Sequence, residues 1–189
     1  MIPTAEKCFE AMDTYAMLDN IKEHSIVVER IAVLIARGLL ETGINLSLEI
    51  VSAGALMHDI AKTQSLDTTV DHTVLGKAIC LEQRMDEIAD IVGEHVTLKD
   101  FDSTGPITEK EIVYYADKRV NHSSVVSLDE RLEYLLHRYG NGNKRIIKAM
   151  LDNFIVWKEV EKRLFARLHF GPEDLAAKVK EEASPLDRS

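Results

Sequence analysis

The chain has 189 residues, of which 46% are hydrophobic and 29% charged, with only four prolines. This length and composition are typical of one globular domain and exclude a disordered or linker-dominated chain. No apolar run approaches the ~20 residues of a membrane span. The first ten residues include Glu6, Lys7 and Glu10, which is not the pattern of a signal peptide. We therefore expect a cytoplasmic protein without a membrane partner.

The charge balance restricts the partners further. The chain carries 32 acidic against 23 basic residues, a net charge of -9, which is the wrong sign for following the backbone of a long nucleic acid. A small phosphorylated ligand held by a local cluster is compatible with this charge. Cys8 and Cys80 lie far apart without a CxxC spacing, so we expect reduced thiols rather than a disulfide or a thiolate zinc site.

Apolar residues recur at helical spacing almost throughout, which predicts an all-α fold, a single-domain helical bundle. Turn chemistry divides the pattern at Gly43, at the segment 99–108 and at Gly140 to Gly142. We expect one domain over 1–189, with a core at about 20–140, C-terminal helices of 143–183 packed on it and a frayed tail at 184–189. In chain order, the predicted helices span about 5–18, 20–41, 47–63, 71–83, 85–96, 108–121, 128–140, 143–169 and 172–183.

Several helices place a polar residue on their apolar stripe. His24 lies three residues after Ile21 and four before Val28, so it points inward. The run AGALMHDIA at 53–61 is apolar on nearly every side, yet it contains His58 and Asp59. The remaining polar residues with inward or nearly inward positions, one in each of three later helices, are His72, His95 and Asp117.

Any one of these residues alone would be interpreted as a hydrogen-bonded core histidine or a paired carboxylate. Four histidines and two aspartates in one core need a cation among them. Nitrogen and carboxylate ligands suit Fe, Mn, Co, Ni or Zn better than Ca or Mg. Because six protein ligands exceed what one catalytic ion normally takes, two ions bridged by a shared carboxylate fit the count better.

The order of these residues resembles that of the HD-domain superfamily of metal-dependent phosphohydrolases. ALMHDIAK at 55–62 is similar to the family's LLHDIGK, with Ala61 in place of the glycine. DHTVLGKAI at 71–79 resembles its His-x-x-x-Gly segment, and VYYADKRV at 113–120 its distal aspartate helix. SLDERLEYLLHRYG at 127–140 resembles the stretch that follows in small bacterial members. The resemblance covers about residues 20–140.

The resemblance implies a division of the ligands. His24, His58, Asp59 and Asp117 would hold a first metal ion. His72 and His95 would hold the second ion of the dinuclear subgroup, with Asp59 bridging. Asp59 and Lys62 are the predicted catalytic residues. Lys62 lies one helical turn after His58, so its side chain can reach the entrance of the metal site.

Basic and imidazole side chains near these motifs are candidates for binding the substrate. Lys62 and Arg119 are the predicted substrate-binding residues, and His122 is a candidate for the entrance. For the remaining basic side chains near the motifs we expect solvated or ion-paired surface charges, namely Lys99, Lys118, Arg131, Lys144 and Arg145.

The implied function is hydrolysis of a phosphate ester or anhydride, in a nucleotide or other small phosphorylated metabolite, by metal-activated water. Within the superfamily the predicted dinuclear site resembles that of diadenosine polyphosphate hydrolases. Two alternatives stay open: a mixed-valent di-iron oxygenase with similar ligands, and a nucleotide-binding regulatory module. The long apolar stripe from Ile147 onward packs on the core or, alternatively, forms a homodimer face.

Overall fold

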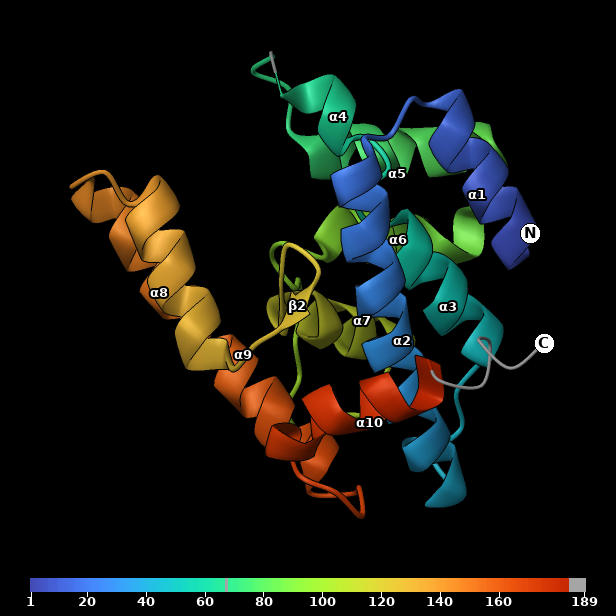
Figure 1. Ribbon diagram of the computed structural model, residues 1–189, viewed down its shortest axis with the longest axis vertical. Coiled ribbons are helices and arrows are strands. Elements are labelled where there is room, and N and C mark those ends of the chain that lie inside the picture. The colour runs from blue at the N-terminus through green and yellow to red at the C-terminus, as the bar shows by residue number, and fades with distance from the viewer. Residues whose placement is uncertain (67, 184–189) are drawn as a thin grey trace.

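The computed structural model describes residues 1–66 and 68–183. Their regular secondary structure is helical apart from one small hairpin, which confirms the all-α prediction (Figure 1). The predicted frayed tail lies outside the described residues. In chain order the elements are α1 (Ala5–Thr14), α2 (Asp19–Glu41), α3 (Leu48–Met57), α4 (Lys62–Ser65), α5 (His72–Glu82), α6 (Asp86–Glu94), α7 (Glu109–Lys118), β1 (Val120–Asn121), β2 (Ser124–Val125), α8 (Leu128–Tyr139), α9 (Lys144–Phe165), the 3-10 turn η1 (Pro172–Asp174) and α10 (Leu175–Ala183).

Side-chain caps explain where several helices begin. Ser47 accepts a hydrogen bond from the Ile50 amide at the start of α3, and Asp71 accepts one from the Thr73 amide at the start of α5. Ser127 forms a reciprocal capping box with Glu130 at the start of α8. These local contacts fix the first turn of each helix and therefore the direction in which it leaves its loop.

The predicted helix over 47–63 is wrong in one respect, because the structure interrupts it at the His-Asp pair. α3 ends at Met57, and residues 58–61 form tight turns before α4 begins. The His58 ring nitrogen Nδ1 donates to the Ala55 carbonyl at 2.7 Å, and the Ile60 amide bonds to the Met57 carbonyl. The carbonyl that would continue the helix is thus occupied by a side chain, so the helix ends where the pair begins.

A short hairpin, whose two strands have two residues each, follows α7. Hydrophobic periodicity did not predict it. Val120 pairs with Val125 and Asn121 with Ser124, and His122 occupies the turn with a positive φ of 54°. Strands of two residues are too short to show alternation in the sequence. The hairpin brings the His122 carbonyl within 2.8 Å of the His24 ring nitrogen Nδ1.

The core consists of two clusters of buried apolar side chains. One is built mainly on α2, α7, the second half of α9 and α10, and the other on α1, α3, α5 and α6. The six predicted metal ligands come from both sets of helices or from the turns that directly follow them. The candidate site therefore lies where the two halves of the core meet.

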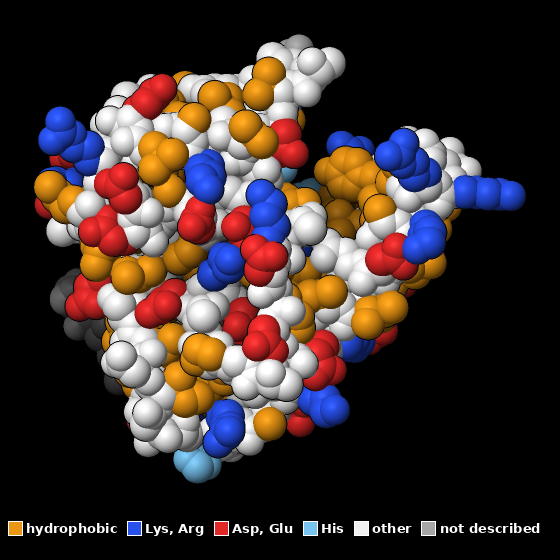
Figure 2. All heavy atoms as spheres, turned by 180° about the vertical axis from the view of Figure 1, so that it is seen from behind, with side chains coloured by type: hydrophobic (Ala, Val, Ile, Leu, Met, Phe, Trp, Pro, Cys, Tyr) orange, Lys and Arg blue, Asp and Glu red, His pale blue; other side chains and the backbone are white. Residues whose placement is uncertain are grey.

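Helix α8 and the first half of α9 form an antiparallel arm that leaves the body of the molecule (Figure 1). Trp157, Val160 and Leu164 in the second half of α9 are buried in the core, whereas Leu151 and Ile155 are 44% and 69% exposed. Figure 2 shows a notch between the arm and the body, with hydrophobic side chains on the wall of the arm. Within the described ranges, no helix is both long and apolar enough to cross a bilayer.

Candidate metal centre

The structure brings His24, His58, Asp59, His72, His95 and Asp117 together. Four of these residues sit at or near helix ends: His58 and His95 follow the last residues of α3 and α6, His72 opens α5, and Asp117 is in the last turn of α7. Because the negative ends of the α3 and α6 dipoles meet at the cluster, its position favours cations.

Three of the four imidazole rings are oriented by backbone carbonyls. Nδ1 of His58 donates to Ala55, that of His95 to Val92 and that of His24 to His122, at 2.7, 2.7 and 2.8 Å. A carbonyl oxygen only accepts, so each Nδ1 carries the proton and each Nε2 is left as the lone-pair nitrogen of the neutral ring. This is the arrangement by which proteins orient histidine ligands toward a metal ion.

The free ligand atoms form two groups that share one carboxylate. His24, His58 and Asp59 offer atoms within 4.8 Å of one another, and so do Asp59, His72 and His95. Asp117 Oδ1 adds to the first group, at 3.0 Å from His24 Nε2 and 3.8 Å from His58 Nε2. Asp59 is thus common to both groups, and the assignment of each group to its own ion stays a prediction.

Two atoms at the centre of the cluster lack hydrogen-bond partners in the described part of the chain. They are His58 Nε2 and Asp59 Oδ1, and both are buried. A buried acceptor left without a partner is costly, and a metal ion is the natural partner for a lone-pair nitrogen beside a carboxylate oxygen. The donor set thus fits divalent metal ions of the type that prefer imidazole and carboxylate ligands.

The electrostatic environment keeps both carboxylates ionised. Burial raises the pKa of Asp59, but His58 and Lys62 outweigh burial and hold this pKa well below its usual value. Burial likewise opposes ionisation of Asp117, whose pKa is nevertheless held well below its usual value by Lys118, by its bond to His24 and by Arg131. Two anionic oxygen ligands are thus available at neutral pH.

Lys62 lies at the edge of the cluster, next to Asp59. Its Nζ donates to Asp59 Oδ2 at 2.7 Å, and its side chain is 38% exposed. It lines both of the cavities that open onto the cluster. A lysine at such a boundary is positioned to meet an anionic group that approaches the metal ligands.

Arg119, the second predicted substrate-binding residue, is not part of this cluster. Its guanidinium donates to the carbonyls of Val126 and Pro172 and to the hydroxyl of Tyr115, and the residue is 5% exposed. These bonds tie α7 to the hairpin and to the start of η1. The spacing from Asp117 was misleading because two residues along a helix turn a side chain by about 200°.

Two residues expected to be surface charges lie beside the cluster instead, Lys118 buried and Arg131 partly buried. Lys118 is 4% exposed and donates to Asp117 Oδ2 at 2.6 Å and to the His95 carbonyl at 2.8 Å. The Arg131 side chain is 12% exposed, and its Nη2 lies 3.7 Å from Asp117 Oδ1. Arg131 begins a stripe on α8 with Leu135 and Tyr139, and this spacing of four residues was the available sequence signal.

Two cavities open onto the candidate ligands. The larger, of 450 Å³, is lined by four of them together with apolar residues of α8 and α9, and the smaller, of 200 Å³, by His24, Asp59 and His122 among others. A cavity of 840 Å³ lies elsewhere, beside Gly43, the 103–107 loop and Arg163, and none of the candidate ligands lines it. The chemistry of the ligands, rather than volume, therefore identifies the site.

A family model described as HD domain matches residues 21–121. This range covers more than half of the chain, contains all six candidate ligands and ends before α8. The recognised HD region thus coincides with the helices that build the cluster, while α8, α9 and α10 lie beyond it.

Several known proteins are similar in sequence to parts of this chain. An uncharacterized protein of Methanocaldococcus jannaschii is 26% identical over 148 residues, 71% of this chain and 86% of that protein. Proteins named tRNA (cytidine(56)-2'-O)-methyltransferase match in Thermoplasma volcanium, 32% identical over 51% of the chain and 27% of that protein, and in Picrophilus torridus, 28% identical over 75% and 42%. The chain thus spans under half of either methyltransferase. No solved structure matches it.

Proposed function

The chain belongs to the HD-domain family. Because members of this family are typically metal-dependent hydrolases, we propose that it is a metal-dependent phosphohydrolase. The proposed substrate is a nucleotide or another small phosphorylated metabolite, in which a phosphate ester or anhydride is cleaved. The observation that carries the proposal is the pair of ligand groups that share Asp59, with unsatisfied His58 Nε2 and Asp59 Oδ1 between them. Such a site suits two divalent ions rather than one.

In the proposed centre His24, His58, Asp59 and Asp117 hold one ion, and Asp59, His72 and His95 hold the other. Divalent ions bound there would supply a nucleophilic water at neutral pH and charge neutralisation at phosphorus. The residues of the chain do the rest. The backbone carbonyls fix the imidazole rings, Lys118 holds Asp117 and the end of α6 in place, and Lys62 meets the phosphate oxygens.

The test combines elemental analysis of the purified protein with a phosphate-release screen over nucleotides and dinucleotides, with Mn²⁺ or Co²⁺ added. We expect two transition-metal ions per chain and release of phosphate or a nucleoside monophosphate. Oxygen uptake under iron loading without phosphate release would replace hydrolysis by oxidation. A protein that retains no metal and cleaves no ester would instead be a regulatory module.

A second candidate substrate class comes from the names of two relatives. Both are named as tRNA methyltransferases and contain a region similar to this chain. The net charge of -9 argues against extended contact with an RNA backbone. The second candidate substrate is therefore a phosphate group at the end of an RNA, which would need only local contacts. Adding 2',3'-cyclic mononucleotides and tRNA with a 3'-terminal phosphate to the same screen tests this. Cleavage of these substrates alone would establish the second class.

A further inference from the structure

Beyond the HD region, the arm of α8 and α9 forms one wall of the 450 Å³ cavity that opens onto the metal-ligand cluster. Arg131, Leu135 and Tyr139 are spaced by four residues on α8, so they share one face of that helix, and all three line the cavity. Helix α9 contributes Met150 and Trp157 to the same wall. The volume is within the range of small-molecule sites.

The base of this stripe carries a positive charge that faces the cluster. Arg131 Nη1 donates to Asn121 Oδ1 at 2.8 Å, and Nη2 lies 3.7 Å from Asp117 Oδ1. Its buried Nε has no hydrogen-bond partner in the described residues. An arginine with unused donors beside metal ligands is suited to the oxygens of a phosphate, which its planar fork binds at two points.

The outer part of the stripe is apolar and exposed. Tyr139 is 48% exposed, and across the cavity Leu66 and Val96 are 60% and 38% exposed. Large apolar side chains beside the charged groups of one cavity indicate a ligand that has both a charged and an apolar part. Figure 2 shows the corresponding hydrophobic surface on the arm, facing the notch.

We propose that the α8–α9 arm is the substrate-recognition element of this protein. Arg131 binds the phosphate beside the metal ions, and the wall of Leu135, Tyr139, Met150 and Trp157 binds a flat apolar ring attached to it. The inference rests on the proposed function. It narrows the substrate to organic phosphates with an aromatic base and disfavours bare sugar phosphates and inorganic phosphates.

The experiment measures binding of adenosine 5'-monophosphate, ribose 5-phosphate and inorganic phosphate to the Mn²⁺-loaded protein by calorimetry; for a probe that is cleaved, KM replaces Kd. We expect the adenosine compound to bind most tightly. Arg131→Ala should weaken all three probes about tenfold or more, as expected for a lost charge-assisted bond. Tyr139→Ala should weaken only the adenosine compound. The bound metal per chain should not change in either variant.

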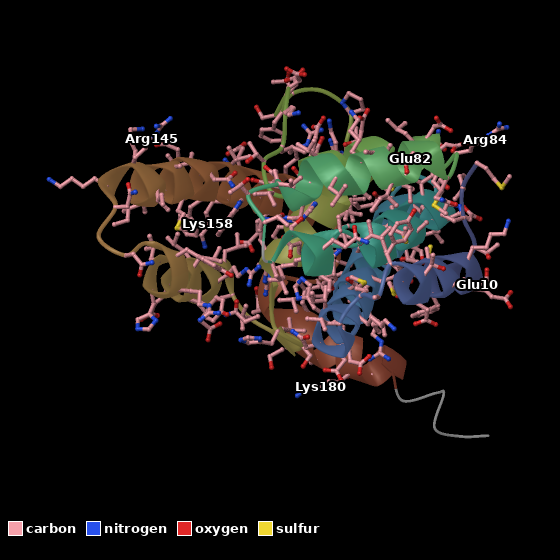
Figure 3. The ribbon with its side chains drawn as sticks, turned by 90° about the horizontal axis from the view of Figure 1, so that it is seen from above. Glu10, Glu82, Arg84, Arg145, Lys158 and Lys180 are labelled. Atoms are coloured by element: carbon pink, nitrogen blue, oxygen red, sulfur yellow. The ribbon has the colours of Figure 1, made fainter. Side chains whose placement is uncertain are left out.

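The matched control is Arg145→Ala, because Arg145 is exposed and lies at the outer end of the arm (Figure 3), and it is not among the residues that line the cavity. It should leave all three affinities unchanged. Loss of metal in Arg131→Ala would overturn the inference and assign Arg131 to positioning Asp117 instead. Equal binding of adenosine and ribose phosphates, or no binding of any probe by the loaded wild type, would also overturn it. Tight binding by a protein that cleaves nothing would contradict only the proposed hydrolysis.

Discussion

At the scale of single residues, the histidines show how a ligand can be oriented by the end of its own helix. His58 and His95 each follow the last residue of a helix and return a ring N–H to the carbonyl three residues earlier. The same bond ends the helix, fixes the tautomer and turns Nε2 toward the cluster. A histidine at the end of a helix thus fixes both the end of that helix and the orientation of its own ring.

The sharing of Asp59 by two ligand groups leads to a prediction about metal stoichiometry. We expect Asp59→Asn to bind no metal, because it removes the bridging carboxylate from both groups. His72→Ala should reduce the content from two ions to one, since its side chain, 25% exposed, belongs to the second group alone. Elemental analysis of the purified variants measures both. Two ions in His72→Ala would show that the second group does not depend on this ring.

Lys62 gives a prediction about turnover. Lys62→Ala removes a cation that lies 2.7 Å from Asp59 and lines both cavities, so kcat/KM should fall tenfold to a hundredfold, roughly the value of a charged hydrogen bond. Metal content should not change. Lys148→Ala is the control, because this lysine pairs with Asp152 on the exposed side of α9. Unaltered kinetics in Lys62→Ala would assign the residue to the surface.

At the scale of elements, a glycine sets how closely α5 and α6 approach. A Cβ on Gly76 would lie 2.8 Å from Val92 Cγ1 and 3.5 Å from Ile60 Cγ2. Val92 is three residues before His95, and Gly76 is one turn after His72. The close approach of the two helices therefore holds His72 Nε2 and His95 Nε2 at 3.2 Å.

We expect Gly76→Ala to destabilise the protein by about 1–3 kcal/mol, because the added methyl forces buried branched side chains apart. Gly93→Ala is the matched control, since the three atoms nearest to its Cβ would all belong to the flexible Lys77 side chain and alanine is the better helix former. Urea unfolding of both variants measures the difference. A Gly76→Ala protein as stable as Gly93→Ala would mean that α6 can shift freely against α5.

At the scale of the whole molecule, the cluster joins the two halves of the core. α2 and α7 contribute His24 and Asp117 from one half, and the other half contributes the remaining four residues. Ligands from both halves mean that an ion bound there cross-links helices distant in sequence. Metal binding should therefore stabilise the fold as a whole.

Thermal unfolding tests this coupling. At Mn²⁺ concentrations a hundredfold above Kd, Tm of the wild type should rise by roughly 5–10 °C, and a chelator should reverse the rise. Asp59→Asn should show no shift with metal, and its metal-free form should be less stable than that of the wild type, because a buried carboxylate that pairs with Lys62 is lost. A metal-dependent rise in Asp59→Asn would place the stabilising ion elsewhere.

The amino-acid sequence alone was enough to predict most of the helices and to single out the six candidate ligands. Hydrophobic periodicity acts over one or two turns, so α2, α5 and α8 begin close to the predicted positions, and side-chain caps add to this at α5 and α8. The six polar residues on apolar stripes were recognisable for the same reason. The position of Arg131 was also indicated locally, because Arg131, Leu135 and Tyr139 are spaced four residues apart and share one face of α8.

Which basic side chains reach the cluster could not be predicted from the sequence, because it depends on long-range packing. Lys118 and Arg131 were expected at the surface and lie beside Asp117, whereas Arg119 was expected at the cluster and instead ties α7 to the hairpin and to η1. A long charged side chain reaches over several ångströms, and its end is placed by partners distant in sequence. The direction of the arm, and with it the wall of the cavity, depends on the same long-range packing of α9 against α7.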